Sequence, residues 1–209
     1  MAAITAKMVA DLRTQTGCGM MDCKKALTES NGDFDGAVKF LREKGLATAA
    51  KKASRIAAEG VIGLYSDGSA SALVELNCET DFVGNGPEFK ALANQIAKTV
   101  VEAKPADLDA LLATTISEGT LSVADAIQDL FLKIRENLKL RRFVLVEGTT
   151  STYIHGLGSI GVIVSFDADE AAVNHPGFAE FAKNVALQVG AYPVAYLNKE
   201  AVPASVIEE

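Results

Sequence analysis

Residues 75–83 read ELNCETDFV and mark the point where an extended segment gives way to a helix. The alternation of apolar and polar side chains over residues 70–78 predicts a strand. The run Asn85-Gly86-Pro87 then predicts the start of a helix, because proline is favoured in the first helical turn. The junction between the two carries a carboxylate, Asp81, beside a large aromatic side chain, Phe82. A phenylalanine at such a corner packs poorly, and we expect it to be exposed and to insert into another molecule.

The second half of the chain repeats the pattern around this junction, a hairpin followed by a helix. The first hairpin is expected over 61–65 and 70–78 with a turn at 66–69, and the second over 153–155 and 160–166 with a turn at 156–158. The helices after them should turn inward Phe89, Leu92, Ile96 and Val100 in the first copy, and Phe181, Val185 and Val189 in the second. A hairpin with one helix covers only one face of its sheet, so the two copies should be joined.

The segment between the copies is expected to be mostly helical over residues 105–138 and to return to a strand over 140–147. Ser122 is a candidate helix cap. The side chains that we expect to face the core are Ile127, Leu130, Ile134 and Leu138.

The N-terminal segment predicts three short helices. Thr5 and Asp33 are candidate caps of the first and third, the second covers about 21–30, and Gly45 is expected to end the third. Three helices in so few residues match the small bundle of ubiquitin-associated domains. The basic stretch 51–55 then favours a solvated helical connector.

Composition and charge exclude several classes of protein. The 209 residues are 49% hydrophobic and 22% charged, as in an ordinary folded protein. A net charge of −7 argues against nucleic acid or an anionic membrane as the main partner. Three cysteines, an odd number, do not make a disulfide framework and fit a reducing compartment. Without a visible secretory or transit segment, we expect a cytoplasmic location.

Two segments resemble the signatures of one known family, bacterial translation elongation factor Ts. They are residues 75–83 and residues 12–27, which read LRTQTGCGMMDCKKAL. The resemblance covers essentially all 209 residues. Together with the pattern above it implies an α+β protein with a three-helix, ubiquitin-associated-like docking domain at 1–46 and a helical connector at 47–59. The expected core is duplicated, with one hairpin-plus-helix subdomain at 60–138 and another, with the tail, at 139–209.

The resemblance also implies a function, guanine nucleotide exchange on elongation factor Tu in translation elongation. In the family, the pair that corresponds to Asp81 and Phe82 enters the GTPase near its bound magnesium and disturbs the phosphate site. Residues Thr80, Asp81, Phe82 and Val83 are therefore expected to contact the partner, and we call residues 80–83 the wedge. GTP would later displace the bound factor.

Further contacts are implied by the resemblance at Arg13, Met20, Met21 and His155, with one of the two methionines expected in the core. Gly84 and Gly86 depart from the family, which more often has alanine or serine at the first position. They lie at the hinge of the wedge, directly after its tip, and are expected to make this hinge less rigid. Longer relatives continue beyond about residue 192 into a coiled-coil module, so the chain is expected to be a short form or a fragment. The resemblance also allows a homodimer in a 2:2 complex.

Two other classes of function stay open at this point. The first is a scaffold whose N-terminal bundle binds ubiquitin-like or helical partners. The second is a thiol enzyme that uses Cys78 with His155 or His175, which the apolar surroundings of Cys78 disfavour. Cys18 and Cys23 lack a second pair and do not have zinc spacing. The Gly-rich run 156–161 precedes a strand instead of a helix, so it does not predict a phosphate loop. We expect no catalytic residue, metal or cofactor.

Overall fold

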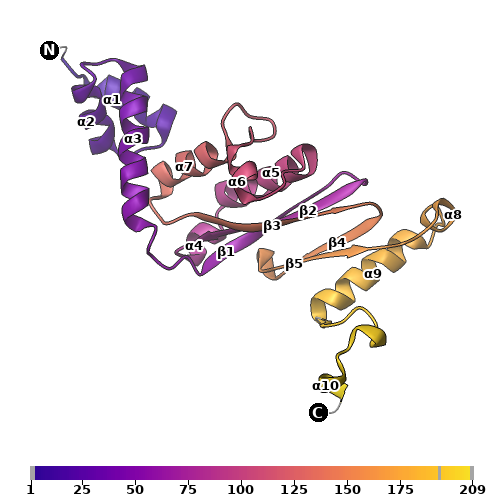
Figure 1. Cartoon of the computed structure of the whole chain (residues 1–209). Helices are drawn as coiled ribbons and strands as arrows, with labels where there is room; N and C mark the ends of the chain where they lie inside the picture. Colours follow the sequence, from indigo (N-terminus) through magenta and orange to yellow (C-terminus); the bar gives the residue numbers. More distant parts are fainter. Residues whose placement is uncertain (1–2, 193, 208–209) are drawn as a thin grey trace.

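The structure, a computed structural model, describes residues 3–192 and 194–207. Three helices come first, and two β-sheets with further helices follow (Figure 1). The α+β class predicted from the sequence is confirmed.

The N-terminal helices form a small bundle at one end of the molecule (Figure 1). Its apolar core also includes Leu132, which comes from a later helix. The helices of the bundle are α1 (Ala6–Thr16), α2 (Met20–Glu29) and α3 (Phe34–Lys52). Both predicted caps are confirmed. Thr5 accepts a hydrogen bond from the amide of Met8 at 3.2 Å, and Asp33 accepts one from the amide of Gly36 at 2.9 Å.

The prediction that Gly45 ends the third helix is wrong, because α3 continues without interruption to Lys52. Gly45 is buried against α7 (Val123–Ile134), and a Cβ atom there would lie only 2.2 Å from Cδ2 of Leu132. The missing side chain thus lets two helices pack closely. Residues 47–52 of the expected connector are the end of α3 itself.

The first sheet has three antiparallel strands in the order β1-β2-β3. They are β1 (Glu59–Ser66), β2 (Ala70–Cys78) and β3 (Lys139–Glu147). The hairpin of β1 and β2 is confirmed, and its turn is held by Asp67, which accepts hydrogen bonds from the amides of Ser69 and Ala70. Helix α5 (Pro87–Ala103) covers one face and buries all four predicted residues, Phe89, Leu92, Ile96 and Val100.

The segment between α5 and β3 holds two helices, α6 (Leu108–Ala113) and α7. Ser122 caps α7 as predicted, since its hydroxyl accepts a hydrogen bond from the amide of Asp125 at 3.0 Å. Leu130 is buried, and Ile127, Ile134 and Leu138 pack against the main core, which confirms their inward orientation.

Strand β3 opens the segment that the sequence assigned to the second core subdomain, yet it pairs with β2 in the first sheet. Local periodicity does not reveal this pairing, because strand pairing is decided by contacts between distant segments.

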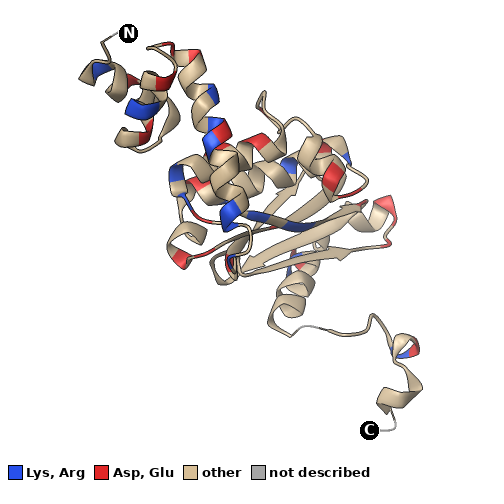
Figure 2. Cartoon of the chain, turned by 60° about the vertical axis from the view of Figure 1, so that its left-hand side comes forward, with Lys and Arg blue, Asp and Glu red and all other residues tan. Residues whose placement is uncertain are grey.

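Strand β3 lies at the edge of the first sheet and carries charged side chains. Arg141 and Arg142 on this edge strand pair with Glu75 at 2.9 and 2.6 Å. Figure 2 shows acidic and basic residues interspersed over helices and strands. Charged side chains on an edge strand oppose pairing with a foreign strand.

The second sheet is the predicted hairpin of β4 (Thr150–His155) and β5 (Ile160–Ser165), joined by η1 (Gly156–Gly158). It lies between the first sheet and α9 (Phe178–Ala191), which follows the short α8 (Glu170–Val173) (Figure 1). A Cβ atom at Gly161 in β5 would lie 2.6 Å from Cγ2 of Ile62 in β1, so the sheets touch. The expected contact between the two hairpin-plus-helix units is therefore confirmed.

Helix α9 turns a different face inward from the one predicted. Ala182, Ala186 and Gly190 are buried, whereas Phe181 is 58% exposed and lies edge-on to Phe166. A Cβ atom at Gly190 would lie 2.9 Å from the ring of Tyr153, so the close approach to the small sheet selects small residues. The prediction that Phe181 faces the core is wrong.

The C-terminal segment leaves the body of the molecule and holds two short helical turns (Figure 1). They are η2 (Lys199–Ala201) and α10 (Ala204–Ile207), neither with a buried residue. No helix among the described residues is both long enough and apolar enough to cross a membrane.

Candidate functional site

The wedge forms a single helical turn, α4 (Asp81–Gly84), directly after β2. Thr80 begins it, since its side chain accepts a hydrogen bond from the amide of Val83 at 3.5 Å and its carbonyl accepts one from the amide of Gly84 at 3.1 Å. Val83 packs partly against the main core, so the turn is anchored on one side. The turn therefore projects Asp81 and Phe82 from the end of the first sheet.

The tip of the wedge lies in solvent. Phe82 is 89% exposed, the value of a side chain with almost no neighbours, and Asp81 is exposed as well. Among the described residues, Asp81 makes no ion pair and no side-chain hydrogen bond. The ring of Phe82 thus lies outside the core, as expected, and the helical turn is capped by Thr80 and not by Asp81.

The hinge of the wedge contains the two glycines that depart from the family pattern. Gly84 is buried, and a Cβ atom there would lie 3.4 Å from the carbonyl oxygen of Gly60 and 3.5 Å from Sγ of Cys78, which are ordinary contacts. At Gly86 the nearest atom would be the carbonyl oxygen of Val83 at 3.0 Å. An alanine thus fits at position 84 and is crowded at position 86.

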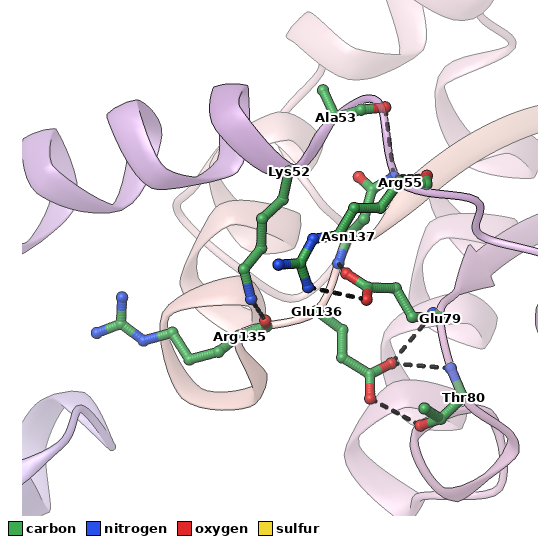
Figure 3. Close-up of polar contacts among 8 residues, drawn as sticks. All are labelled: Lys52, Ala53, Arg55, Glu79, Thr80, Arg135, Glu136 and Asn137. Atoms are coloured by element: carbon green, nitrogen blue, oxygen red, sulfur yellow. Dashed lines mark hydrogen bonds and ion pairs between the residues drawn. The ribbon is translucent and has the colours of Figure 1, made fainter.

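A set of reciprocal contacts, which no sequence pattern predicted, holds the base of the wedge (Figure 3). Glu136 accepts hydrogen bonds from the amides of Glu79 and Thr80 at 3.1 and 3.0 Å and from the Thr80 hydroxyl at 2.7 Å. In return, Glu79 accepts from the amide of Asn137 at 2.7 Å and pairs with Arg55 at 3.3 Å. The hydrogen bond from Asn137 lowers the pKa of Glu79 below its ordinary 4.5. We call Glu79, Glu136 and Asn137 the brace.

Three of the predicted contact residues line one groove on the N-terminal bundle. Arg13, Met20 and Met21 share a groove of about 650 Å³ with apolar side chains of α1, among them Val9. Met20 is 58% and Met21 75% exposed. The expectation that one of the two methionines lies in the core is wrong, because Cys23, Ala26 and Leu27 already fill the inner face of α2. We call this surface the docking groove.

His155 ends β4 and lies on the exposed loop of the second hairpin. Its Nδ1 is hydrogen-bonded to the hydroxyl of Tyr153 at 2.7 Å. In the same loop, Leu157 is 79% exposed and holds a φ of 61°, a conformation unusual for leucine. A Cβ atom at Gly158 would lie 2.3 Å from Val61 in β1, so this loop contacts the start of β1.

The structure thus brings the wedge and the His155 loop to the same end of the first sheet, because Gly84 and Gly158 both contact the first residues of β1. Helices α1 and α2, whose side chains line the docking groove, lie apart from them in the N-terminal bundle (Figure 1). A partner that meets all three surfaces must extend along this side of the molecule.

The cysteines do not form a reactive site. Cys18, Cys23 and Cys78 are all buried. Burial raises the pKa of the Cys78 thiol to about 11, and it also raises the pKa of Cys23. A thiol that stays protonated at neutral pH is a poor nucleophile. In the described part of the chain, no three His, Cys, Asp or Glu side chains gather as metal ligands would.

Comparison with known proteins identifies the family. Residues 79–209 match the family model described as Elongation factor TS. The chain is 45% identical to elongation factor Ts of Syntrophotalea carbinolica, over 99% of this chain and 68% of the relative. Elongation factor Ts of Symbiobacterium thermophilum is 46% identical over 100% of this chain and 68% of its own length, and that of Chromobacterium violaceum 47% over 100% and 69%.

The chain belongs to the elongation factor Ts family. It is therefore a nucleotide exchange factor for elongation factor Tu, acts in protein biosynthesis and catalyses no covalent reaction. The resemblance drawn from residues 12–27 and 75–83 is confirmed. The thiol enzyme is excluded, in agreement with the three buried cysteines.

Proposed function

We propose that the wedge enters the nucleotide-binding domain of elongation factor Tu, disturbs its magnesium and phosphate site, and thereby releases GDP. The observation that carries the proposal is the exposure of Phe82, 89%, on a turn whose base is hydrogen-bonded from two sides. An aromatic ring left in water by the free factor gains burial only in a complex. The adjoining carboxylate of Asp81 carries the charge that repels phosphate oxygens and competes for magnesium.

Small displacements are sufficient for fast release. GTPases hold the phosphates with loop amides and a magnesium ion that requires near-ideal geometry. Each charge-assisted contact that is lost removes roughly 1.5–3 kcal/mol of nucleotide affinity. A loss of about 4 kcal/mol corresponds to a roughly thousandfold faster dissociation, if it appears in the off-rate. Linkage then requires that bound nucleotide weaken the factor equally, so GTP can displace it.

The docking groove and His155 supply the remaining contacts in this proposal. Exposed methionines adapt to a partner surface, and Arg13 adds a charged donor at the edge of the same groove. His155 lies at the wedge end of the first sheet, where its loop meets the partner near the inserted residues. These contacts hold elongation factor Tu in place, and the wedge acts on its nucleotide site.

The finer description of the fold also belongs to this proposal. The three-helix bundle, residues 1–46, is a ubiquitin-associated-like docking domain, followed by a connector at 47–59 of which the first part is α3. The core is a duplication with subdomains at 60–138 and 139–209, although β3 pairs with the first. The repeated order of hairpin and covering helix, β1-β2-α5 and β4-β5-α9, supports this.

A second copy of the chain is the further partner that we propose, in a 2:2 complex with elongation factor Tu. Exposed apolar side chains gather on α9 and the segment after it; they are Phe181, Tyr192, Val194, Tyr196 and Leu197. Contiguous exposed apolar patches mark interaction sites between proteins, and these side chains supply the apolar surface that such a contact needs. Sedimentation of the factor alone and with its partner tests this, and a monomer and a 1:1 complex would refute it.

Nucleotide release tests the main proposal directly. Elongation factor Tu loaded with a fluorescent GDP analogue is mixed with excess GDP, with and without the chain, and the fluorescence decay is followed. We expect the decay to accelerate by orders of magnitude and to saturate with the concentration of the chain. Binding without acceleration is the behaviour of a scaffold and would refute the proposed mechanism.

A further inference from the structure

We propose that Glu136 is a positioning residue for nucleotide exchange, because its carboxylate fixes the strand end from which Asp81 and Phe82 project. The inference rests on the wedge function proposed above and adds a residue outside the wedge that makes it effective. Glu136 lies 54 positions after Phe82 in sequence, in the turn between α7 and β3.

The wedge needs such support because it has little structure of its own. Helix α4 has four residues, far fewer than an isolated helix requires to be stable in water. Its two outermost side chains, Asp81 and Phe82, are exposed and add no packing. The direction of the tip is therefore set by the residues immediately before it and by the partly buried Val83.

Glu136 binds those residues through both of its carboxylate oxygens. One oxygen accepts hydrogen bonds from the amides of Glu79 and Thr80, and the other accepts one from the hydroxyl of Thr80 at 2.7 Å (Figure 3). Hydrogen bonds to an ionised acceptor are about twice as strong as neutral ones. Three such bonds on two consecutive residues fix the orientation of the chain directly before Asp81.

The turn that carries Glu136 is itself held from several sides. The Asn137 amide donates to Glu79, and the Asn137 side chain donates to the carbonyl of Arg55 at 2.8 Å. Lys52, the last residue of α3, donates to the carbonyl of Arg135. A movement of the strand end relative to this turn would therefore break bonds in both directions.

The same turn is connected to the docking groove. The guanidinium of Arg135 pairs with Asp22 of α2 at 2.9 Å, and Asp22 follows Met21 directly in sequence. Asp22 also pairs with Lys44 of α3 at 2.5 Å. One continuous set of contacts thus leads from the docking groove through Arg135 and Glu136 to the base of the wedge. A docked partner therefore meets Phe82 at a fixed place.

The test compares the full chain with the variants Glu136→Gln and Glu147→Gln. Glutamine keeps the size of the side chain and one acceptor oxygen but loses the charge and the second acceptor. Glu147 is a matched control at the other end of β3, about 27 Å from Lys139 at roughly 3.4 Å per residue. For Glu136→Gln we expect amide hydrogen exchange over residues 79–83 to accelerate at least about tenfold, the effect of losing one charge-assisted bond.

The same variant should lower the maximal rate of GDP release about tenfold, while the concentration for half-maximal release changes less than about twofold. Such a split is the signature of a misplaced tip in a complex that still forms. Glu147→Gln should change neither measurement. Unchanged hydrogen exchange at residues 79–83, or an unchanged maximal rate, in Glu136→Gln would overturn the inference.

A combined variant separates the inference from the function on which it rests. If Glu136 acts only through the tip, adding Glu136→Gln to a chain that already carries Asp81→Ala and Phe82→Ala slows GDP release no further. A further additive loss would mean that Glu136 acts elsewhere and would overturn the inference. If Phe82→Ala by itself leaves the rate unchanged, the proposed function of the wedge is wrong. The hydrogen-exchange result then still decides whether Glu136 positions the strand end.

Discussion

Replacement of Phe82 by alanine should abolish most of the exchange activity and leave the fold intact. Burying a phenylalanine side chain fully contributes about 1.5–3 kcal/mol to folding. Phe82 is 89% exposed, so its truncation removes only about a tenth of this, roughly 0.3 kcal/mol. In a chain of this length that lowers the melting temperature by about 1 °C.

The effect on exchange should be much larger, because an aromatic anchor inserted into a partner typically contributes at least about 2 kcal/mol. If that energy is used to displace the nucleotide, its loss lowers the maximal release rate about thirtyfold. The contrast between a stability change of tenths of a kcal/mol and a rate change of more than tenfold is therefore the prediction.

The assay pairs thermal unfolding with release of a fluorescent GDP analogue from elongation factor Tu. Two control variants bracket the result. Ile56→Ala removes another exposed apolar side chain, 85% exposed, and should change neither measurement. Phe89→Ala empties a core position that is 1% exposed and should cost about 3–5 kcal/mol of stability. If Phe82→Ala unfolds as readily as Phe89→Ala, or exchanges like the unmodified chain, the reasoning is refuted.

Three further predictions concern docking to the partner, packing between α3 and α7, and the stability of the fold at low pH. Arg13→Ala should raise the concentration needed for half-maximal GDP release with less change in the maximal rate, and a pure loss of maximal rate in a titration would contradict its place in the docking groove. Gly45→Ala should lower stability by about 1 kcal/mol in thermal unfolding, since crowding of the new methyl group against Leu132 outweighs the gain in helix propensity; a more stable variant would mean that α3 and α7 separate easily. The hydrogen bond from Lys44 holds the pKa of Asp22 below 3.8, and the hydrogen bond from Asn137 lowers the pKa of Glu79 below 4.5. Both carboxylates therefore stabilise the fold above about pH 5, and this contribution is lost as the pH falls through their lowered pKa values. The melting temperature should therefore drop between pH 5 and 3, and less so in Asp22→Asn or Glu79→Gln.

Local patterns predicted the elements well. The caps Thr5, Asp33 and Ser122 lie where the sequence placed them, because a cap is decided by residues three positions apart. Both hairpins and the inner face of α5 are likewise confirmed. The exposure of Phe82 was also expected, from its place at a corner between a strand and a helix and from the resemblance of its surroundings to a family signature.

Contacts between distant segments could not be predicted in this way. The pairing of β3 with β2 and the burial of Gly45 against Leu132 depend on how elements meet in space. The brace is of the same kind: Glu79 and Glu136 are ordinary surface glutamates until the fold brings each to the other's backbone. Sequence reasoning therefore found the tip of the wedge and missed what holds it.

The continuity of α3 makes the distance between the two working surfaces a fixed length. Nineteen residues at about 1.5 Å each give a rod of roughly 28 Å that begins in the bundle and ends beside the brace. A glycine-rich tether would tolerate insertions, whereas one residue added to this rod would rotate the bundle by about 100° about the helix axis. In the proposed complex, only a GTPase whose two receptor surfaces match that spacing and angle could contact both the docking groove and the wedge.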